Sequence, residues 1–173
     1  LLGSVSIAVV VSGSKDNAVA EMTTSNPTLA PTTPAFLLQQ DIQSESDRDF
    51  FGHYVEFSRD ESTVAIGAPG YFPSVQVFRK TAGSSDWERI GQTIEGKGGA
   101  FGHRLDLNED GNTLVIGAPK NNEMGENAGL VRVYKYNGSD SWVQVGQDVK
   151  GLEATVEFGW DVAISDDGRT FVA

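Results

Sequence analysis

The sequence predicts an all-β fold made of repeated four-stranded antiparallel units. Three Phe-Gly dipeptides, Phe51-Gly52, Phe101-Gly102 and Phe158-Gly159, recur at intervals of roughly 50 residues. The first two are followed at equal distance by Gly-Ala-Pro, which ends at Pro69 and Pro119. Self-similarity at a fixed period is the signature of a repeat architecture, and the short apolar runs within each period have the length of strands.

Each complete repeat contains four such runs. They lie at 54–58, 63–66, 75–78 and 87–94 in the first repeat, and at 104–108, 113–116, 131–134 and 142–149 in the second; 161–165 and 170–172 begin a third. The first and third runs alternate apolar and polar residues, which predicts one buried face. The second runs are continuously apolar, which predicts burial on both faces. Asp110-Gly111 and Asp167-Gly168 predict tight turns between the first and second strands.

Four antiparallel strands in about 40–50 residues is the size of one β-propeller blade. We therefore expect residues 36–173 to form about two and a half blades, fewer than the ~4–8 blades that close a ring. This predicts a part of a longer protein, with an open array that assembles with its own copies as the alternative. Residues 38–42 resemble 90–94 and 145–149, so the chain enters the repeats on a fourth strand, which in a closed ring pairs with strands from the other terminus.

Two segments precede the repeats. Residues 1–14 are largely apolar and too short to span a bilayer, which takes about 20 residues, so they predict the remnant of a membrane anchor or a signal segment. A β-strand is the alternative, because Val5, Ile7, Val9 and Val11 alternate with smaller residues. Residues 15–35 contain a Ser/Thr/Pro-rich run that predicts a solvated stalk outside the cell or an ordinary linker.

The composition excludes several function classes. The chain of 173 residues has no cysteine, which excludes disulfides and thiolate-based zinc or redox sites. Its net charge is −11, and it has no cluster of Lys and Arg, so nucleic acid is not an expected partner.

The Phe-Gly and Gly-Ala-Pro pattern with strands between them resembles the FG-GAP repeat of integrin α-subunit-type β-propellers, over Phe51 to Ala173 and the strand at 38–42. The resemblance implies an extracellular ring used for adhesion or ligand binding. Many such repeats carry a calcium loop of alternating oxygen ligands, and the best match is Asp106, Asn108 and Asp110 before Gly111. Leu114 and Val115 lie where a further carboxylate is expected, so we interpret 106–111 as a hairpin turn without a metal.

The ionisable residues do not form a recognisable catalytic set. His53 and His103 both follow Phe-Gly, and Trp160 takes this place in the third repeat, which indicates a packing position. No other His and no Cys is available for a Ser-His or Cys-His nucleophile system. The neighbouring carboxylates all lie in predicted loops or turns and are expected to be solvated; they are Glu45, Asp47 and Asp49, Glu109 and Asp110, and Asp166 and Asp167. We predict no catalytic residue, no cofactor and no metal.

The remaining features concern loops. Lys97-Gly98-Gly99-Ala100 precedes a strand instead of a helix, so we interpret it as a connection between blades and not as a phosphate loop. Asn137-Gly138-Ser139 is both a glycosylation sequence and a hairpin turn. Trp87, Trp142, Phe78 and Tyr134 recur and should pack between blades. The loop 120–129 does not recur, and a variable loop on a constant scaffold is the best candidate for a ligand-facing feature.

Together these observations predict a non-enzymatic propeller that recognises a protein or a glycan, secreted or anchored in a membrane through its N-terminal segment. The alternatives are an accessory propeller of an extracellular enzyme whose catalytic domain lies outside this chain, and a purely structural spacer.

Overall fold

The computed structural model describes residues 7–12, 37–43, 49–83 and 86–173, and within these ranges it is all-β, with no helix. The strands are β1 (Ile7–Ser12), β2 (Leu37–Gln43), β3 (Tyr54–Phe57), β4 (Thr63–Ala68), β5 (Ser74–Lys80), β6 (Trp87–Arg89), β7 (Ile94–Glu95), β8 (Arg104–Leu107), β9 (Thr113–Ala118), β10 (Leu130–Tyr136), β11 (Trp142–Lys150), β12 (Ala163–Ile164) and β13 (Phe171–Val172). The all-β prediction is confirmed for these residues.

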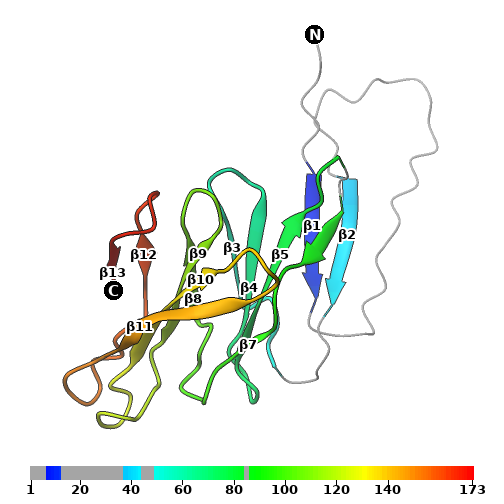
Figure 1. The fold of residues 1–173 in the computed structure, drawn as a ribbon. Helices are drawn as coiled ribbons and strands as arrows, with labels where there is room; N and C mark the ends of the chain where they lie inside the picture. Colours follow the sequence, from blue (N-terminus) through cyan, green and yellow to red (C-terminus); the bar gives the residue numbers. More distant parts are fainter. Residues whose placement is uncertain (1–6, 13–36, 44–48, 84–85) are drawn as a thin grey trace, which may run out of the picture.

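Two antiparallel sheets form the body of the molecule. The first has the order β3-β4-β5-β6, with β7 also paired to β5, and the second has the order β8-β9-β10-β11. Sequential strands are neighbours in both, so each sheet is a simple meander. The short pair β12-β13 follows the second sheet, and Figure 1 shows the pair β1-β2 and the pair β12-β13 on opposite sides of the two sheets.

The hydrophobic patterns explain most of the burial. Every residue of β4 and β9 is buried, as their continuous apolar runs predicted. The expected alternation is clear in β8, where Leu105 and Leu107 are buried between half-buried neighbours. It is not seen in β3, because Phe57 is 43% exposed and leans edge-on against the ring of Trp87 instead of entering a core.

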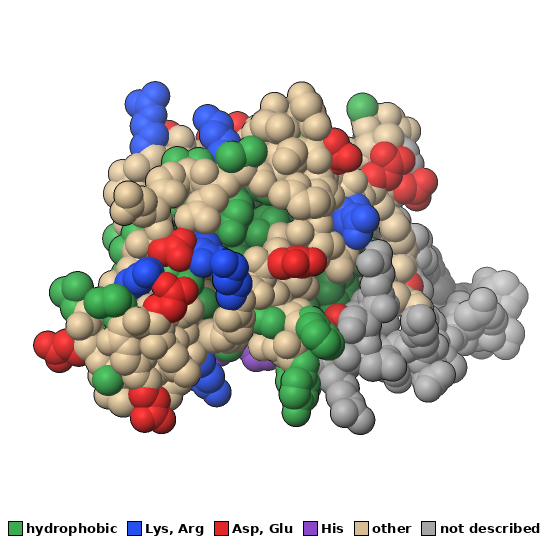
Figure 2. All heavy atoms as spheres, turned by 60° about the horizontal axis from the view of Figure 1, so that its bottom comes forward, with side chains coloured by type: hydrophobic (Ala, Val, Ile, Leu, Met, Phe, Trp, Pro, Cys, Tyr) green, Lys and Arg blue, Asp and Glu red, His purple; other side chains and the backbone are tan. Residues whose placement is uncertain are grey.

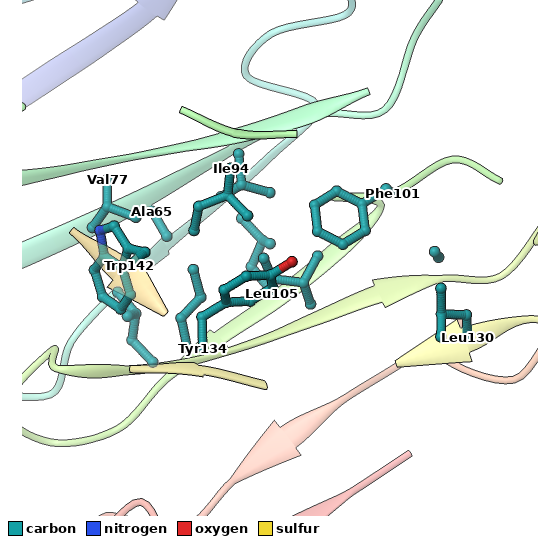
Figure 3. Packing of buried hydrophobic residues seen from close by; sticks show 13 residues of the cluster. Ala65, Val77, Ile94, Phe101, Leu105, Leu130, Tyr134 and Trp142 are labelled. Carbon is teal, nitrogen blue, oxygen red and sulfur yellow. The ribbon is translucent and has the colours of Figure 1, made fainter. Parts of the chain in front are cut away.

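The main core lies between the two sheets. It contains Ala65, Val77 and Ile94 from the first sheet, and Leu105, Tyr134 and Trp142 among others from the second; Figure 3 shows these side chains facing one another. Burial of a large apolar side chain contributes roughly 1.5–3 kcal/mol, so this layer is the principal attachment between the sheets. The predicted packing of the recurring aromatic residues between the repeats is confirmed for Trp142 and Tyr134.

The repeated glycines mark a close approach of two main chains. A Cβ atom on Gly67 would lie 2.1 Å from the carbonyl oxygen of Gly102, and one on Gly117 would lie 2.1 Å from that of Gly159. The Gly of each Gly-Ala-Pro therefore packs on the Gly of the next Phe-Gly. The two motifs recur together because any side chain at these positions would push successive repeats apart.

A side-chain amide joins the fourth strands of successive repeats. Gln92 donates to the carbonyl oxygen of Trp142 at 2.8 Å and accepts from its N–H at 2.9 Å. Gln40 in β2 forms the same pair of bonds with Trp87. This confirms the alignment of residues 38–42 with 90–94. The neighbour of β2 is β1, in parallel, so residues 7–12 adopt the β-strand that the sequence left as the alternative to an anchor; residues 1–6 and 13–36 lie outside the described ranges.

Three predicted strands differ from the structure. The fourth run of the first repeat is divided into β6 and β7, whereas β11 is continuous through the equivalent residues. The third repeat contains only two residues in each of β12 and β13, shorter than the runs 161–165 and 170–172. Its Val162 is nevertheless buried against Val115 and Val131, so the third repeat begins on the outer face of the second sheet.

Candidate binding site

The sheets have two ends of different character. The turns that join β3 to β4, β8 to β9 and β12 to β13 lie at one end, uppermost in Figure 1, which we call the turn end. The loops after β4 and β9 and the connections between the repeats lie at the other end, which we call the loop end. Figure 2 views the molecule from the side of the loop end, where hydrophobic side chains protrude among acidic and basic ones.

At the turn end, the residues that best match a calcium loop, Asp106, Asn108 and Asp110, accept hydrogen bonds from the main chain. Asn108 Oδ1 accepts the N–H groups of Asn112 and Thr113 at 3.1 and 2.8 Å, and Asp110 Oδ1 also accepts that of Asn112. Asp106 accepts the N–H of Ile164 in β12. Burial raises the pKa of the Asp106 carboxyl. These three side chains therefore close a turn and join two repeats, as the hairpin interpretation of 106–111 requires.

The other turns use equivalent groups. Ser58 Oγ donates to Asp60 and accepts the N–H of Thr63, and Ser165 Oγ makes the same contacts with Asp167 and Thr170. Main-chain bonds then link the turns in series: Asp60 N–H donates to Glu109 O, and Glu109 N–H donates to Asp166 O, each at 3.2 Å. Asp166 also forms an exposed ion pair with Arg59.

The carboxylates singled out in the sequence do not converge. Glu109, Asp110, Asp166 and Asp167 are exposed in the turns, as predicted. Asp49 is instead buried at the loop end, 5% exposed, where it accepts the N–H of Phe51. Glu45 and Asp47 lie outside the described residues. No group of three or more His, Asp or Glu side chains is arranged to hold a metal within the described ranges.

The residues after the Phe-Gly dipeptides form a column of rings. The centroids of His53 and His103 are 5.1 Å apart, and those of His103 and Trp160 are 4.7 Å apart. Burial lowers the pKa of His103, and the nearby His53 lowers it further, so the neutral imidazole is favoured. The contacts agree with the prediction that this is a packing position, one ring per repeat.

One residue further along the chain, the contacts are charged. The Arg104 guanidinium lies 4.6 Å from the ring centroid of Tyr54, and its Nε is 3.7 Å from Asp161. Glu56 and Asp106 occupy the next position on the same face of their strands, and both are half-buried. Burial raises the pKa of Glu56, and the neighbouring Asp106 raises it further. The first strands of the repeats therefore face one another through matched positions.

The loop 120–129 is anchored at its ends and open in its middle. Asn121 and Ala128 are buried, whereas Met124 is 52% exposed. The loop is bonded to the connection that follows the second sheet, since Thr155 and Glu157 donate their N–H groups to Glu126 and Asn127. It thus presents a short exposed segment on a fixed base at the loop end.

The first sheet carries a pocket of about 490 Å³ at the same end. Its wall includes Asp49, Tyr71 and Phe72, Gln76 and Thr93, and the connection residue Lys97. Tyr71 and Phe72 follow Gly-Ala-Pro in the short loop before β5, and they are 79% and 74% exposed. Sequence reasoning missed this pocket; the available signal was a pair of adjacent aromatic residues in a loop whose sequence does not recur in the second repeat.

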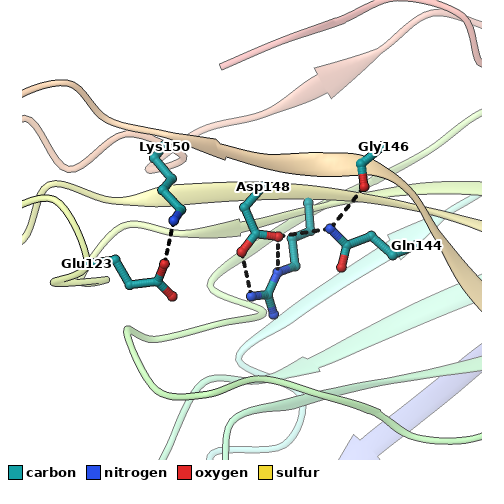
Figure 4. Close-up of polar contacts among 6 residues, drawn as sticks. Glu123, Gln144, Gly146, Asp148 and Lys150 are labelled. Atoms are coloured by element: carbon teal, nitrogen blue, oxygen red, sulfur yellow. Dashed lines mark hydrogen bonds and ion pairs between the residues drawn. The ribbon is translucent and has the colours of Figure 1, made fainter.

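The second sheet has ion pairs at this end. Arg132 forms two bonds of 2.8 Å with the carboxylate of Asp148, which Gln144 also contacts, and Lys150 pairs with Glu123 of the loop; Figure 4 shows this arrangement. The bonds from Arg132 lower the pKa of Asp148 to about 2.

The two remaining motifs lie in connections. Residues 97–100 link β7 to β8, as expected, and Gly99 O accepts the N–H of Lys120. Asn137 lies in the turn between β10 and β11, where its side-chain oxygen accepts the N–H groups of Ser139 and Ser141. The side chain is exposed, and its glycosylation stays a prediction.

Comparison with known proteins adds no relative: no family model matches the sequence, and no curated protein matches it. A search of the described residues for a helix long and apolar enough to cross a membrane finds none.

Proposed function

We propose that the two sheets are successive blades of a β-propeller, and that the loop end is a non-enzymatic binding face for a protein or a glycan. The proposal extends to a secreted or membrane-displayed protein, in keeping with the Ser/Thr/Pro-rich run before the repeats and the resemblance to FG-GAP repeats. The support for the fold is the stacking of two meanders through their first strands, with matched contacts at each repeat position.

One observation supports a binding role above all. The two sheets match in their glycine contacts, amide bonds and turn bonds, yet the loops after β4 and β9 differ in length and chemistry. The first loop carries two exposed aromatic rings, and the second carries the exposed segment around Met124. Constant scaffolds with variable loops at one end are typical of proteins that bind through those loops.

The test is a loop replacement in the whole chain. Residues 120–129 are replaced by Gly70–Pro73 of the first repeat, and saturable binding of the fluorescently labelled chain to cultured cells is measured. We expect the replacement to weaken binding at least tenfold. The matched control, Arg59→Ala at the turn end, should leave binding unchanged. Absence of saturable binding by the unaltered chain, or an equal loss in the control, would contradict the proposal.

A further inference from the structure

The pocket at the loop end of the first sheet is lined by Gln76 and Thr93, two positions at which the two sheets differ. Val75 and Gln76 in β5 correspond to Val131 and Arg132 in β10, because both valines pair with the fourth strand at equivalent residues, Ile94 and Val149. By the same register, Thr93 corresponds to Asp148.

In the second sheet these two positions are occupied by the bonded pair Arg132 and Asp148. In the first sheet they carry the shorter Gln76 and Thr93, whose side chains form no hydrogen bond within the described part of the chain. The space that a guanidinium and a carboxylate fill in one sheet is therefore open in the other. The pocket follows from two side-chain differences on a common backbone.

The side-chain amide of Gln76 has no hydrogen-bond partner within the described part of the chain. It is only 7% exposed, and it lines the pocket. Its amide atoms reach the open space of the pocket, so a ligand there can bond to them directly. An amide both donates and accepts, as does the neighbouring Thr93 hydroxyl, and these are the properties that sugar hydroxyl groups require.

The mouth of the pocket supplies the complementary apolar surface. Tyr71 and Phe72 are among the most exposed large hydrophobic residues of the described chain. The C–H face of a pyranose ring is apolar and packs against the electron-rich face of an aromatic ring. Two exposed rings beside a polar wall thus match the two sides of a sugar.

The charges select against anions. Asp49 and Glu95 lie on the wall with a single cation, Lys97. A phosphate or sulfate group in the pocket would lie near two carboxylates, which repel it. The volume of about 490 Å³ is within the usual range of roughly 300–1,000 Å³ for small-ligand sites.

We propose that this pocket binds a neutral pyranose saccharide, with Gln76 and Thr93 bonding its hydroxyl groups and Tyr71 and Phe72 stacking on its ring. The inference rests on the proposed binding function and names a ligand class for one part of the loop end.

The experiment is saturation-transfer NMR on the full chain with methyl glycosides of glucose, galactose, mannose and N-acetylglucosamine, and with glucose 6-phosphate as the anionic probe. We expect at least one neutral glycoside to bind, with the strongest transfer at the C–H protons of its ring. Glucose 6-phosphate should bind at least tenfold more weakly than this glycoside.

Two variants locate the site. Gln76→Arg with Thr93→Asp installs the pair that the second sheet already accommodates, and Tyr71→Ala with Phe72→Ala removes the stacking surface. Each should weaken binding at least tenfold, whereas Arg59→Ala at the opposite end should not. Circular dichroism and the melting temperature verify folding of each variant.

The proposal is overturned if no neutral glycoside binds, if either double variant retains full affinity, or if Arg59→Ala loses as much affinity as the double variants. These outcomes are distinct from a failure of the proposed function. A chain that binds cells in a manner dependent on 120–129 but binds no glycoside retains the binding function and loses only this ligand assignment.

Discussion

The bonded pair of Arg132 and Asp148 illustrates how single residues distinguish the two sheets. Both side chains are largely buried. Arg132 Nε and Nη2 donate to the two carboxylate oxygens of Asp148, and Gln144 donates a further hydrogen bond to this carboxylate. Bidentate pairs of this kind are geometrically specific and stronger than exposed ion pairs. The pair fixes the end of β11 against β10, at the position where the first sheet is open.

The pair predicts a defined dependence of stability on pH. The pKa of Asp148 falls from 3.8 to about 2 on folding, so the charged form stabilises the folded chain above pH 4, and this contribution is lost as the pH falls toward 2. Its size is roughly 2 kcal/mol. Asp148→Asn should lower the free energy of unfolding in urea by about 2–3 kcal/mol at pH 7 and by much less near pH 2.

Glu109→Gln is the matched control for this measurement. Its exposed side chain forms no hydrogen bond within the described residues, so the change should stay within about 0.5 kcal/mol at every pH. An equal effect of both substitutions would show that net charge, and not the pair, governs the acid dependence.

At the scale of elements, the fourth strands are joined by one amide per repeat. Gln92 satisfies both the N–H and the carbonyl of Trp142, so its loss leaves two main-chain groups without a partner at the interface between sheets. Gln147 occupies the same position in the next repeat but is exposed, with no bond from its side chain in the described part of the chain.

This difference gives an internal comparison. Gln92→Ala should lower the free energy of unfolding by about 1–3 kcal/mol, because two hydrogen bonds are removed. Gln147→Ala should change it by less than about 0.5 kcal/mol. Chemical denaturation of both variants checks the expectation, and a similar cost at the two positions would refute the role assigned to Gln92.

The elements also show what sequence reasoning reached. Burial of β4 and β9 followed from their continuous apolar runs, and the equivalence of residues 38–42 with 90–94 followed from their similar sequences, because both depend on pattern and period. The division of β6 from β7 and the pocket behind Gln76 did not follow. They depend on how side chains on paired strands pack in three dimensions, and the spacing of a sequence repeat carries no information on this packing.

For the molecule as a whole, the surface of β11 carries several exposed apolar side chains. Val145 and Val149 are 50% and 40% exposed, whereas the equivalent of Val149 in the first sheet, Ile94, is buried beneath the second sheet. β11 is also an edge strand of its sheet. A long edge strand with exposed apolar side chains favours association between chains.

We therefore expect the chain to self-associate at about 100 µM, in the range where such surfaces aggregate. Val145→Lys should shift it toward the monomer in sedimentation velocity, because a lysine on an edge opposes pairing. Met124→Lys adds the same charge at a distant exposed position and should not. A monomeric unaltered chain at this concentration would contradict the expectation.

The series of main-chain bonds from Asp60 to Glu109 to Asp166 has a consequence for how the chain tolerates insertions. An added residue in any of these turns would displace a donor or an acceptor used by its neighbour, so a change of length in one repeat would disturb the next. The opposite loops have no such shared bonds to one another in the described ranges. Peptide grafting should therefore succeed after Pro69 or beside the exposed Met124, and fail between β8 and β9.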